Sequence, residues 1–265
     1  MTRIYIITDL EGVSGLYDIS QIFDVGTPHF QAGLERLVVD TNAAIRGAFD
    51  GGADEVIVTD GHGSGKNFSL AKTPLDERAI VMPTWDVDFR TMKVDALMHV
   101  GTHAKAGTQC AFLDHTQSSK TIFNYTINGR HCGELVQAAL WAGAYDIPYI
   151  FVSGDQAACD EGIEFFGNIV TAPVKYCIER NKAICMPDDE AEKLIYEKAK
   201  ESMSLIGTNR VRPYKVSMPM EVVQEYTRAD YADAVYNLKT DLDRLDARTL
   251  RKVVNKIEVY KDVKF

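Results

Sequence analysis

Short apolar runs rich in β-branched residues are the feature that most constrains the fold of this chain. They lie at residues 3–9, 55–61, 96–103 and 148–155. Apolar residues occupy both alternating positions of each run, which indicates strands that are covered on both faces, as in a parallel sheet. Helical patterns lie between runs, at 30–49 and from 133 to about 144. Strands that alternate with helices predict an α/β fold, with a mostly parallel sheet flanked by helices.

The pattern changes in the second half of the chain. Residues 121–132 contain Asn128-Gly129, which is a strong signal for a two-residue hairpin turn. A charged amphipathic helix is predicted at 188–205, and residues 215–226 alternate like an antiparallel strand. The remaining tail is predicted to be helical, through Leu242, Leu245, Leu250 and Val253-Val254. We therefore expect a main α/β domain at 1–206 and a smaller C-terminal α+β lobe at 207–265.

Charge and cysteine content argue against several classes of protein. Lys and Arg total 29 against 38 Asp and Glu, a net charge of −9, whereas nucleic-acid binding depends on cations that neutralise phosphates. No apolar stretch approaches the roughly 20 residues that span a bilayer, and the first apolar run is too short for a signal peptide. The five cysteines are scattered without a C-x-x-C pair, which favours reduced thiols. We expect a soluble, cytoplasmic protein that binds neither nucleic acid nor membrane.

Polar side chains that can bind metal ions follow the predicted strands. Asp9 and Glu11 come directly after the first run, His62 after the second and His103 after the third. Because the ligand crevice of an open α/β sheet lies at the carboxyl ends of its strands, we expect these side chains to gather at one edge. Glu134, at the start of the helix that follows the hairpin, can join them.

These five residues form a mixed set of oxygen and nitrogen donors, which suits zinc and similar divalent ions. Five ligands exceed what one catalytic zinc takes, because such an ion keeps one position open for water. Two metals roughly 3.5–4 Å apart, with one carboxylate bridging them, would use all five, and this arrangement serves hydrolysis. The residues therefore predict two divalent metal ions per chain, zinc being one ion that suits these donors.

Each of these residues also has a structural interpretation. Asp9 can cap a turn after its strand, and an acid such as Glu134 in the first turn of a helix is favourable without a metal. His62 lies between two glycines, where packing gives no reason for an imidazole, so metal binding is favoured there. His99 falls inside an apolar run and is expected to be a core histidine, whereas His103 at the end of that run is the better ligand.

His115 lies outside this set. It follows Asp114 at the start of a polar loop, where it is either a catalytic histidine beside the metals or an exposed loop residue. His29 and His131 have no identifiable partner and are interpreted as structural. Residues 12–15 resemble a glycine-rich phosphate loop only loosely, because the lysine and the spacing of a Walker motif are missing.

Five motifs, in this order, resemble those of the D-aminopeptidase family, a group of zinc-dependent peptidases. They are TDLEGVSG at 8–15, DGHGSGKN at 60–67, VGTHAKAG at 100–107, DHT at 114–116 and NGRHCGE at 128–134. The resemblance covers the chain to about residue 155 by motif, and the C-terminal third carries no matching motif. By this resemblance the five residues named above match the dinuclear zinc ligands of the family, and His115 matches its proposed catalytic residue.

The resemblance also implies an activity and an assembly. It implies release of an N-terminal D-amino acid, typically D-alanine, from short peptides, and a homo-oligomer, a decamer of stacked rings whose active sites face an internal channel. Two zinc ions would activate water and polarise the scissile carbonyl, and one would hold the free α-amine of the substrate. His115 would act as general acid/base or as nucleophile, and the sequence does not choose between them.

Two other functions fit the residues alone. Asp and His ligands at strand ends also serve dinuclear metal phosphoesterases, but the motif regions hold few cations to neutralise phosphate, Lys66 and Lys105 being the nearest. A metal- or small-molecule-binding protein without turnover would keep the ligands but would have no need of His115. We rank the peptidase first, the phosphoesterase second and the binding protein third.

Overall fold

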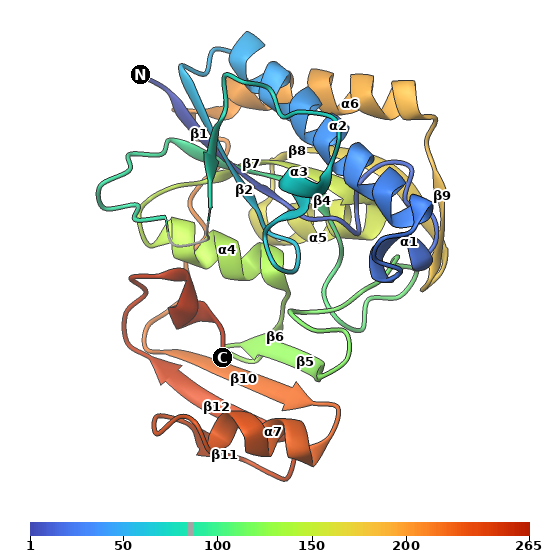
Figure 1. The fold of residues 1–265 in the computed structure, drawn as a ribbon. Coiled ribbons are helices and arrows are strands. Elements are labelled where there is room, and N and C mark those ends of the chain that lie inside the picture. Colours follow the sequence, from blue (N-terminus) through green and yellow to red (C-terminus); the bar gives the residue numbers. More distant parts are fainter. Residues whose placement is uncertain (84–86) are drawn as a thin grey trace.

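The computed structural model describes residues 1–83 and 87–265, and its main feature is a seven-stranded sheet in the order β3-β2-β1-β4-β7-β8-β9 (Figure 1). The strands are β1 (Arg3–Thr8), β2 (Glu55–Asp60), β3 (Ile80–Met82), β4 (Ala96–Thr102), β7 (Tyr149–Asp155), β8 (Val170–Glu179) and β9 (Lys182–Cys185). Neighbouring strands are parallel except β8 and β9, which form an antiparallel hairpin. The predicted α/β class and mostly parallel sheet are confirmed.

Helices cover both faces of this sheet. On one face α2 (Pro28–Asp50) packs against α6 (Asp188–Ser202), and α4 (Glu134–Gly143) and α5 (Gln156–Phe166) lie on the other (Figure 1). Every residue of β4 and β7 is buried as a result, which explains why their apolar residues occupy both alternating positions. The helix α2 begins where Thr27 Oγ1 accepts a hydrogen bond from the Phe30 amide (3.2 Å), with proline at its first position.

The strand order creates a crevice beside β1. The chain runs from β1 outwards to β2 and β3, and then returns to β4 on the other side of β1. Thr8, the last residue of β1, is therefore paired with Asp60 of β2 and with Val100 of β4. The loops that follow β1 and its neighbours diverge where the strand order reverses in this way. Ligands of open α/β sheets bind in the crevice between such loops.

The loop after β1 and the end of β4 approach each other too closely for a residue larger than glycine at position 12 or 101. Gly101 has a φ of 75°, and a Cβ there would lie 2.3 Å from the Asp9 carbonyl oxygen. A Cβ on Gly12 would lie 2.0 Å from the Thr102 carbonyl oxygen, and the Gly12 amide donates to the Gly101 carbonyl (2.7 Å). Two glycines thus hold the loop that carries Asp9 directly against β4.

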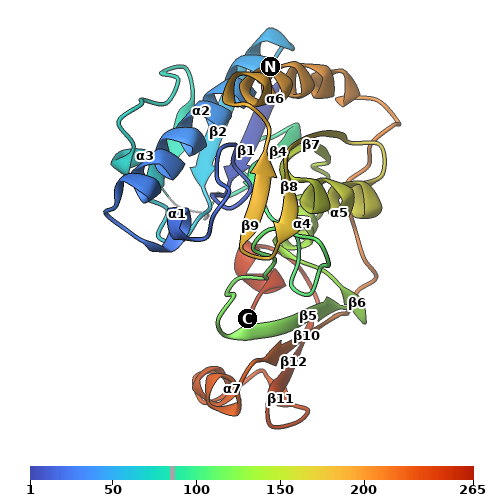
Figure 2. The same cartoon turned by 90° about the vertical axis from the view of Figure 1, so that its right-hand side faces the viewer.

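A second, smaller sheet is antiparallel and has the order β11-β12-β10-β5-β6. Its strands are β5 (Ile122–Ile127), β6 (Arg130–His131), β10 (Met220–Tyr226), β11 (Asp243–Arg244) and β12 (Thr249–Val254). The predicted turn at Asn128-Gly129 joins β5 to β6. This sheet thus combines strands from the middle and the end of the chain. Figure 2 shows it as a layer below the main domain, with α7 (Ala229–Tyr236) at the far end.

The prediction of a helical tail through Leu242, Leu245, Leu250 and Val253-Val254 is wrong, because residues 243–244 and 249–254 are strands. In β12 the buried positions alternate, at Leu250, Lys252 and Val254. The lysine disguises this alternation in the sequence. Its Nζ donates to the backbone carbonyl of Lys264, so that the polar group is satisfied inside the lobe.

The remaining elements are short. They are α1 (Ser20–Phe23), α3 (Asn67–Leu70) and the 3₁₀ helices Met203–Leu205 and Tyr260–Val263, the second of which packs against α4. Within residues 1–83 and 87–265, none of the helices combines the length and apolar character needed to cross a membrane.

Candidate metal centre

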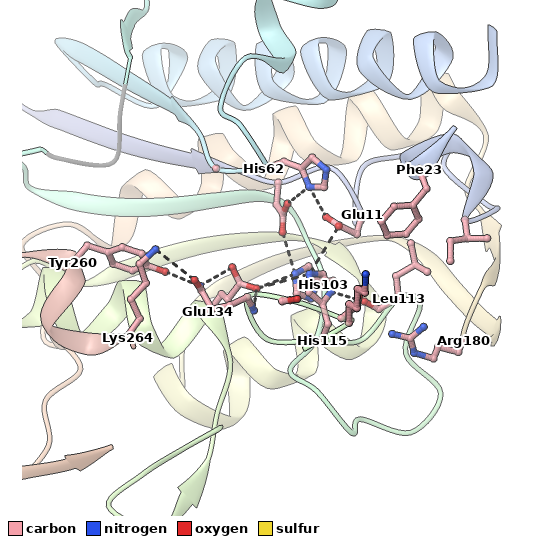
Figure 3. A pocket seen from close by; sticks show the side chains of 18 residues that line it. Glu11, Phe23, His62, His103, Leu113, His115, Glu134, Arg180, Tyr260 and Lys264 are labelled. Atoms are coloured by element: carbon pink, nitrogen blue, oxygen red, sulfur yellow. Dashed lines mark hydrogen bonds and ion pairs between the residues drawn. The ribbon is translucent and has the colours of Figure 1, made fainter. Parts of the chain in front are cut away.

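A cavity of about 500 Å³ opens over the carboxyl ends of β1, β2 and β4 (Figure 3). The predicted ligands and the predicted catalytic histidine all line it, namely Asp9, Glu11, His62, His103, His115 and Glu134. Asp9 and Glu134, 125 positions apart in the sequence, therefore lie in one cavity. This agrees with the expectation that residues at the carboxyl ends of parallel strands gather at one edge of the sheet.

The candidate ligands form two groups of donor atoms. In the first, His62 Nδ1 lies 3.1 Å from Asp9 Oδ1 and 3.1 Å from Glu11 Oε2. In the second, Glu134 Oε1 lies 3.5 Å from His103 Nε2 and 4.0 Å from His115 Nε2. Each group brings oxygen and nitrogen donors close enough to share one ion.

The Asp9 carboxylate joins the two groups. Its Oδ1 faces His62, whereas its Oδ2 lies 3.2 Å from His103 Nε2. The loop after β1 fixes this orientation, since the Leu10 amide donates to Oδ1 (2.9 Å). Asp9 therefore contacts both groups of donor atoms.

Backbone carbonyls orient two of the imidazoles. His103 Nδ1 lies 3.0 Å from the Ala104 carbonyl oxygen, and His115 Nδ1 lies 2.8 Å from that of Leu113. A carbonyl can only accept, so Nδ1 of each ring carries a proton, and Nε2 is the nitrogen that faces the carboxylates. The two rings stack with centroids 3.8 Å apart. Metal-binding histidines are commonly held by this kind of second hydrogen bond.

The carboxylates of the cluster are stabilised by positive charge nearby. Burial raises the pKa of Asp9, but hydrogen bonds from His103 and His62 outweigh it and hold that pKa well below its usual value. Burial acts in the same way on Glu134, where His103 and His115 lower the pKa to about 2. The same contacts hold the pKa values of His62 and His103 well above the usual value, despite burial. Charged carboxylates thus draw protons onto their histidine neighbours, and a divalent cation fits this donor set.

A polar network shapes the loop that carries His62. The Asp60 carboxylate accepts hydrogen bonds from the His62 amide (3.2 Å) and from the Asn67 side chain (3.0 Å). Asn67 Nδ2 also donates to the His62 carbonyl (2.9 Å). Asp60 and Asn67 therefore fix the imidazole over the cavity without entering it.

A buried lysine anchors the loop after β1. Lys175 is fully buried, and its Nζ donates to the carbonyls of Glu11 and Leu16 (both 2.7 Å). Ser14 lies in the same loop, and its amide and hydroxyl both donate to the Asp40 carboxylate of α2 (both 2.6 Å). The Ser14 amide is thereby occupied, so residues 12–15 serve as a braced turn and not as a phosphate cradle.

The other histidines divide as follows. His99 is buried in the core as predicted, with Nδ1 3.3 Å from the Tyr149 hydroxyl. His29 is exposed near the start of α2. His131, whose partner the sequence did not identify, has its Nδ1 2.6 Å from Asn124 Oδ1 across the β5–β6 hairpin. That pairing becomes visible only when the register of the hairpin is known.

Several residues of the cavity were missed by sequence reasoning. Gln117 contacts Glu134 directly. Tyr260 and Lys264 lie on the same side as Glu134, whereas Phe23 and Arg180 lie on the opposite side (Figure 3). These residues belong to no motif, and only the packing of segments that are distant in the sequence brings them to the cavity. The cations that line this cavity are Lys120, Arg180 and Lys264, not the Lys66 and Lys105 that the motif regions suggested.

A family model for D-aminopeptidases matches residues 2–263. The chain belongs to the D-aminopeptidase family. It is 31% identical to a D-aminopeptidase of Bacillus subtilis (strain 168) over 238 residues, which are 88% of this chain and 83% of the relative. Among solved structures it is similar to the Zn-dependent D-aminopeptidase DppA from Bacillus subtilis, described as a self-compartmentalizing protease. The TM-score is 0.87 at 27% identity, over 98% of this chain and 95% of that one.

These findings confirm the family resemblance carried by the five motifs and the expectation of an enzyme. The chain is a hydrolase of the aminopeptidase class, and its fold is that of the Bacillus enzyme. A match over almost the whole chain includes the C-terminal third, in which no motif was found.

His99 makes a measurable contribution to the pH dependence of stability. Burial lowers its pKa from 6.5 to about 4. As the pH falls through 6.5 the unfolded chain takes up a proton at His99, and the folded chain does not until about pH 4. The free energy of unfolding therefore falls with the pH across this window, by about 3 kcal/mol in total from this group. We expect His99→Gln to remove that part of the slope, as measured by urea unfolding at fixed protein concentration.

Metal-free protein is used for both curves, so that loss of bound ions does not enter, and the other titrating groups cancel in the difference. Parallel curves for the parent and His99→Gln between pH 6.5 and 4 would show that His99 is not held neutral.

Proposed function

We propose that this aminopeptidase removes an N-terminal D-amino acid, such as D-alanine, from short peptides at a dinuclear zinc site. The observation that carries the proposal is the pair of ligand groups joined by Asp9, in a chain of the D-aminopeptidase family. The zinc dependence and the D-amino acid preference are taken from the names of the family and of the Bacillus structure.

The residues present fit two ions. Glu11 and His62 would hold the first and His103 and Glu134 the second, with Asp9 shared between them. Bound zinc would supply Lewis acidity, which activates water and polarises the scissile carbonyl. The chain contributes the fixed orientation of the ligands, because backbone carbonyls, Lys175 and Asp60 restrict their movement before any ion binds.

His115 is proposed to move the proton. Its Nε2 lies 4.0 Å from Glu11 Oε1 and 4.0 Å from Glu134 Oε1, inside the cavity, and its Nδ1 is held by the Leu113 carbonyl. Water adds to the carbonyl carbon and the C–N bond breaks. As general acid/base His115 takes the proton of the water at Nε2 and delivers it to the departing nitrogen. A nucleophilic role for Nε2 is the alternative that the sequence left open.

The cavity supports short substrates. A volume of about 500 Å³ lies within the usual range for small ligands and holds a few residues of peptide, not a folded chain. In a short peptide the terminal carboxylate is close to the scissile bond, and Lys120, Arg180 and Lys264 line the same cavity as possible partners for it.

A shortage of cations to neutralise phosphate no longer argues against a phosphoesterase, because Lys120, Arg180 and Lys264 line the cavity. Membership of the D-aminopeptidase family favours the peptidase. A panel of D- and L-aminoacyl p-nitroanilides beside p-nitrophenyl phosphate, with and without zinc, separates the three functions. Hydrolysis of the D-alanyl substrate is expected. Turnover of the phosphate ester alone, or of no substrate, would reject the proposal.

We also propose that this chain forms a homo-oligomer, with the decamer as the specific expectation. The support is the similar Bacillus structure, which is described as self-compartmentalizing. Light scattering at micromolar concentration is expected to give about ten times the 29.5 kDa mass of one chain. A monomer under these conditions would contradict the assembly without affecting the chemistry.

The metal model predicts two divalent ions per chain after reconstitution with zinc. Asp9→Ala is expected to lose more metal than Glu134→Ala, because a shared carboxylate contributes to both sites. Elemental analysis of the purified proteins measures this. Asp160→Ala, which removes an exposed carboxylate of α5, is the control and should keep both ions. One ion or none in the reconstituted parent would reject the dinuclear site.

His115→Ala separates catalysis from metal binding. We expect it to keep the metal content and the fold but to lose roughly 10²–10⁴-fold in turnover of D-alanyl p-nitroanilide, the usual range for removal of a proton-transfer group. His29→Ala, which removes an exposed histidine of α2, should retain full activity. Unchanged turnover in His115→Ala would make His115 an ordinary loop residue. Lost metal would make it a ligand, a position that its distance from Glu134 also allows.

A further inference from the structure

The last residues of the chain form part of the active-site cavity. Tyr260 and Lys264 line it on the side of Glu134, across from Phe23 and Arg180 (Figure 3). Most of the other lining residues belong to segments before residue 135. The C-terminal segment, residues 257–265, must therefore return from the small sheet to reach the cavity.

Hydrogen bonds from three side chains and packing against α4 hold this segment in place. The Tyr125 hydroxyl of β5 donates to the Val263 carbonyl, and Lys252 of β12 donates to that of Lys264. Tyr145 donates to the Glu258 carbonyl (2.8 Å). Tyr260 and Val263 are themselves buried against α4. These contacts satisfy backbone carbonyls along the segment, which therefore has a fixed position at the edge of the cavity.

Gln117 connects this segment to the candidate metal centre. Its backbone amide donates to Glu134 Oε1 (2.7 Å), and its side-chain Nε2 donates to Glu134 Oε2 (3.1 Å). One residue thus holds both oxygens of the carboxylate. Gln117 has a φ of 63°, a left-handed conformation that is unfavourable for a residue with a side chain and that is maintained only where other contacts require it.

The C-terminal segment and α4 fix the orientation of the Gln117 amide. Lys264 Nζ donates to Gln117 Oε1 (3.4 Å), while Gln117 Nε2 donates to Gln137 Oε1 (2.9 Å). The Tyr260 hydroxyl donates to the same Gln137 oxygen (3.2 Å). Because its oxygen faces Lys264, the amide must present its NH₂ group to Glu134.

We propose that Gln117 is a positioning residue that fixes the Glu134 carboxylate, and that the C-terminal segment fixes Gln117 through Lys264 and Tyr260. The inference rests on the proposed function, since Glu134 is a proposed zinc ligand. With both oxygens restrained, Oε1 keeps its place 3.5 Å from His103 Nε2. Outer partners of this kind typically change metal affinity by about 10–100-fold when they are removed.

The test compares zinc affinity in matched variants. Gln117→Met keeps the length of the side chain and the backbone donor but removes the side-chain hydrogen bonds. We expect it to weaken zinc binding by roughly 10–100-fold, measured by competition of the metal-free protein with a zinc-chelating dye. Its kcat should return towards that of the parent as free zinc is raised, because all five ligands remain. Glu134→Ala lacks a ligand and should not recover.

The C-terminal variants test the second part of the proposal. Lys264→Met and Tyr260→Phe are each expected to weaken zinc binding by roughly 2–10-fold, the equivalent of one net hydrogen bond. In a Gln117→Met background they should have no further effect, since they act through Gln117. Lys256→Met, which removes an exposed lysine paired with Glu258, is the control and should bind zinc like the parent.

The melting temperature of each metal-free variant separates positioning from general stability. Parent-like melting with weakened zinc binding supports the proposal. Parent-like zinc affinity in Gln117→Met would overturn it, as would equal effects of Lys264→Met in both backgrounds. If Gln117→Met does not fold, the zinc affinities of Lys264→Met and Tyr260→Phe test the proposal in its place. Parent-like affinity in both variants would then overturn it. A parent that binds zinc in this pattern but cleaves no peptide would refute the proposed function and leave the role of Gln117 standing.

Discussion

Three carboxylates gathered at one end of a parallel sheet, Asp9 and Glu11 buried and Glu134 half-buried, are the constraint on which the rest of this structure depends. A buried carboxylate is costly unless cations and hydrogen-bond donors compensate it. Asp9, Glu11 and Glu134 therefore need His62 and His103 beside them, and the direction of the pKa shifts shows how strongly these groups interact. Only a strand order that places β2 and β4 on either side of β1 brings both imidazoles to Asp9. The divalent cations that we propose for this site would compensate its negative charge.

The surrounding structure restrains these groups before any ion is bound. Glycine at position 101 allows the loop after β1 to lie against β4. Lys175 restrains the same loop by donating to two of its backbone carbonyls. Asp60 does the same for the loop of His62, and Gln117 for Glu134. None of these four is a candidate ligand. Their shared effect is to remove the conformational freedom that would otherwise be lost on binding a metal and a substrate.

The sequence predicted most of the fold because the central strands β1, β2, β4 and β7 are buried on both faces and cannot be mistaken for amphipathic helices. It failed for residues 243–254, where the strands are short and the buried position 252 is a lysine. A charged residue at a buried position hides the alternation that marks a strand, and here the Lys252 ammonium group reaches the backbone carbonyl of Lys264. Sequence alternation records burial reliably only when the buried residues are apolar.

By itself the sequence determined the class of fold and the candidate ligands Asp9, Glu11, His62 and His103, because each of these follows a strand and parallel strands end at one edge. It also determined the family, through five motifs in order. The tertiary structure alone decided that Asp9 lies between two histidines and that the last residues of the chain complete the cavity beside Gln117. The physical reason is that contacts between segments 53 to 147 residues apart depend on packing and register, which no local pattern records.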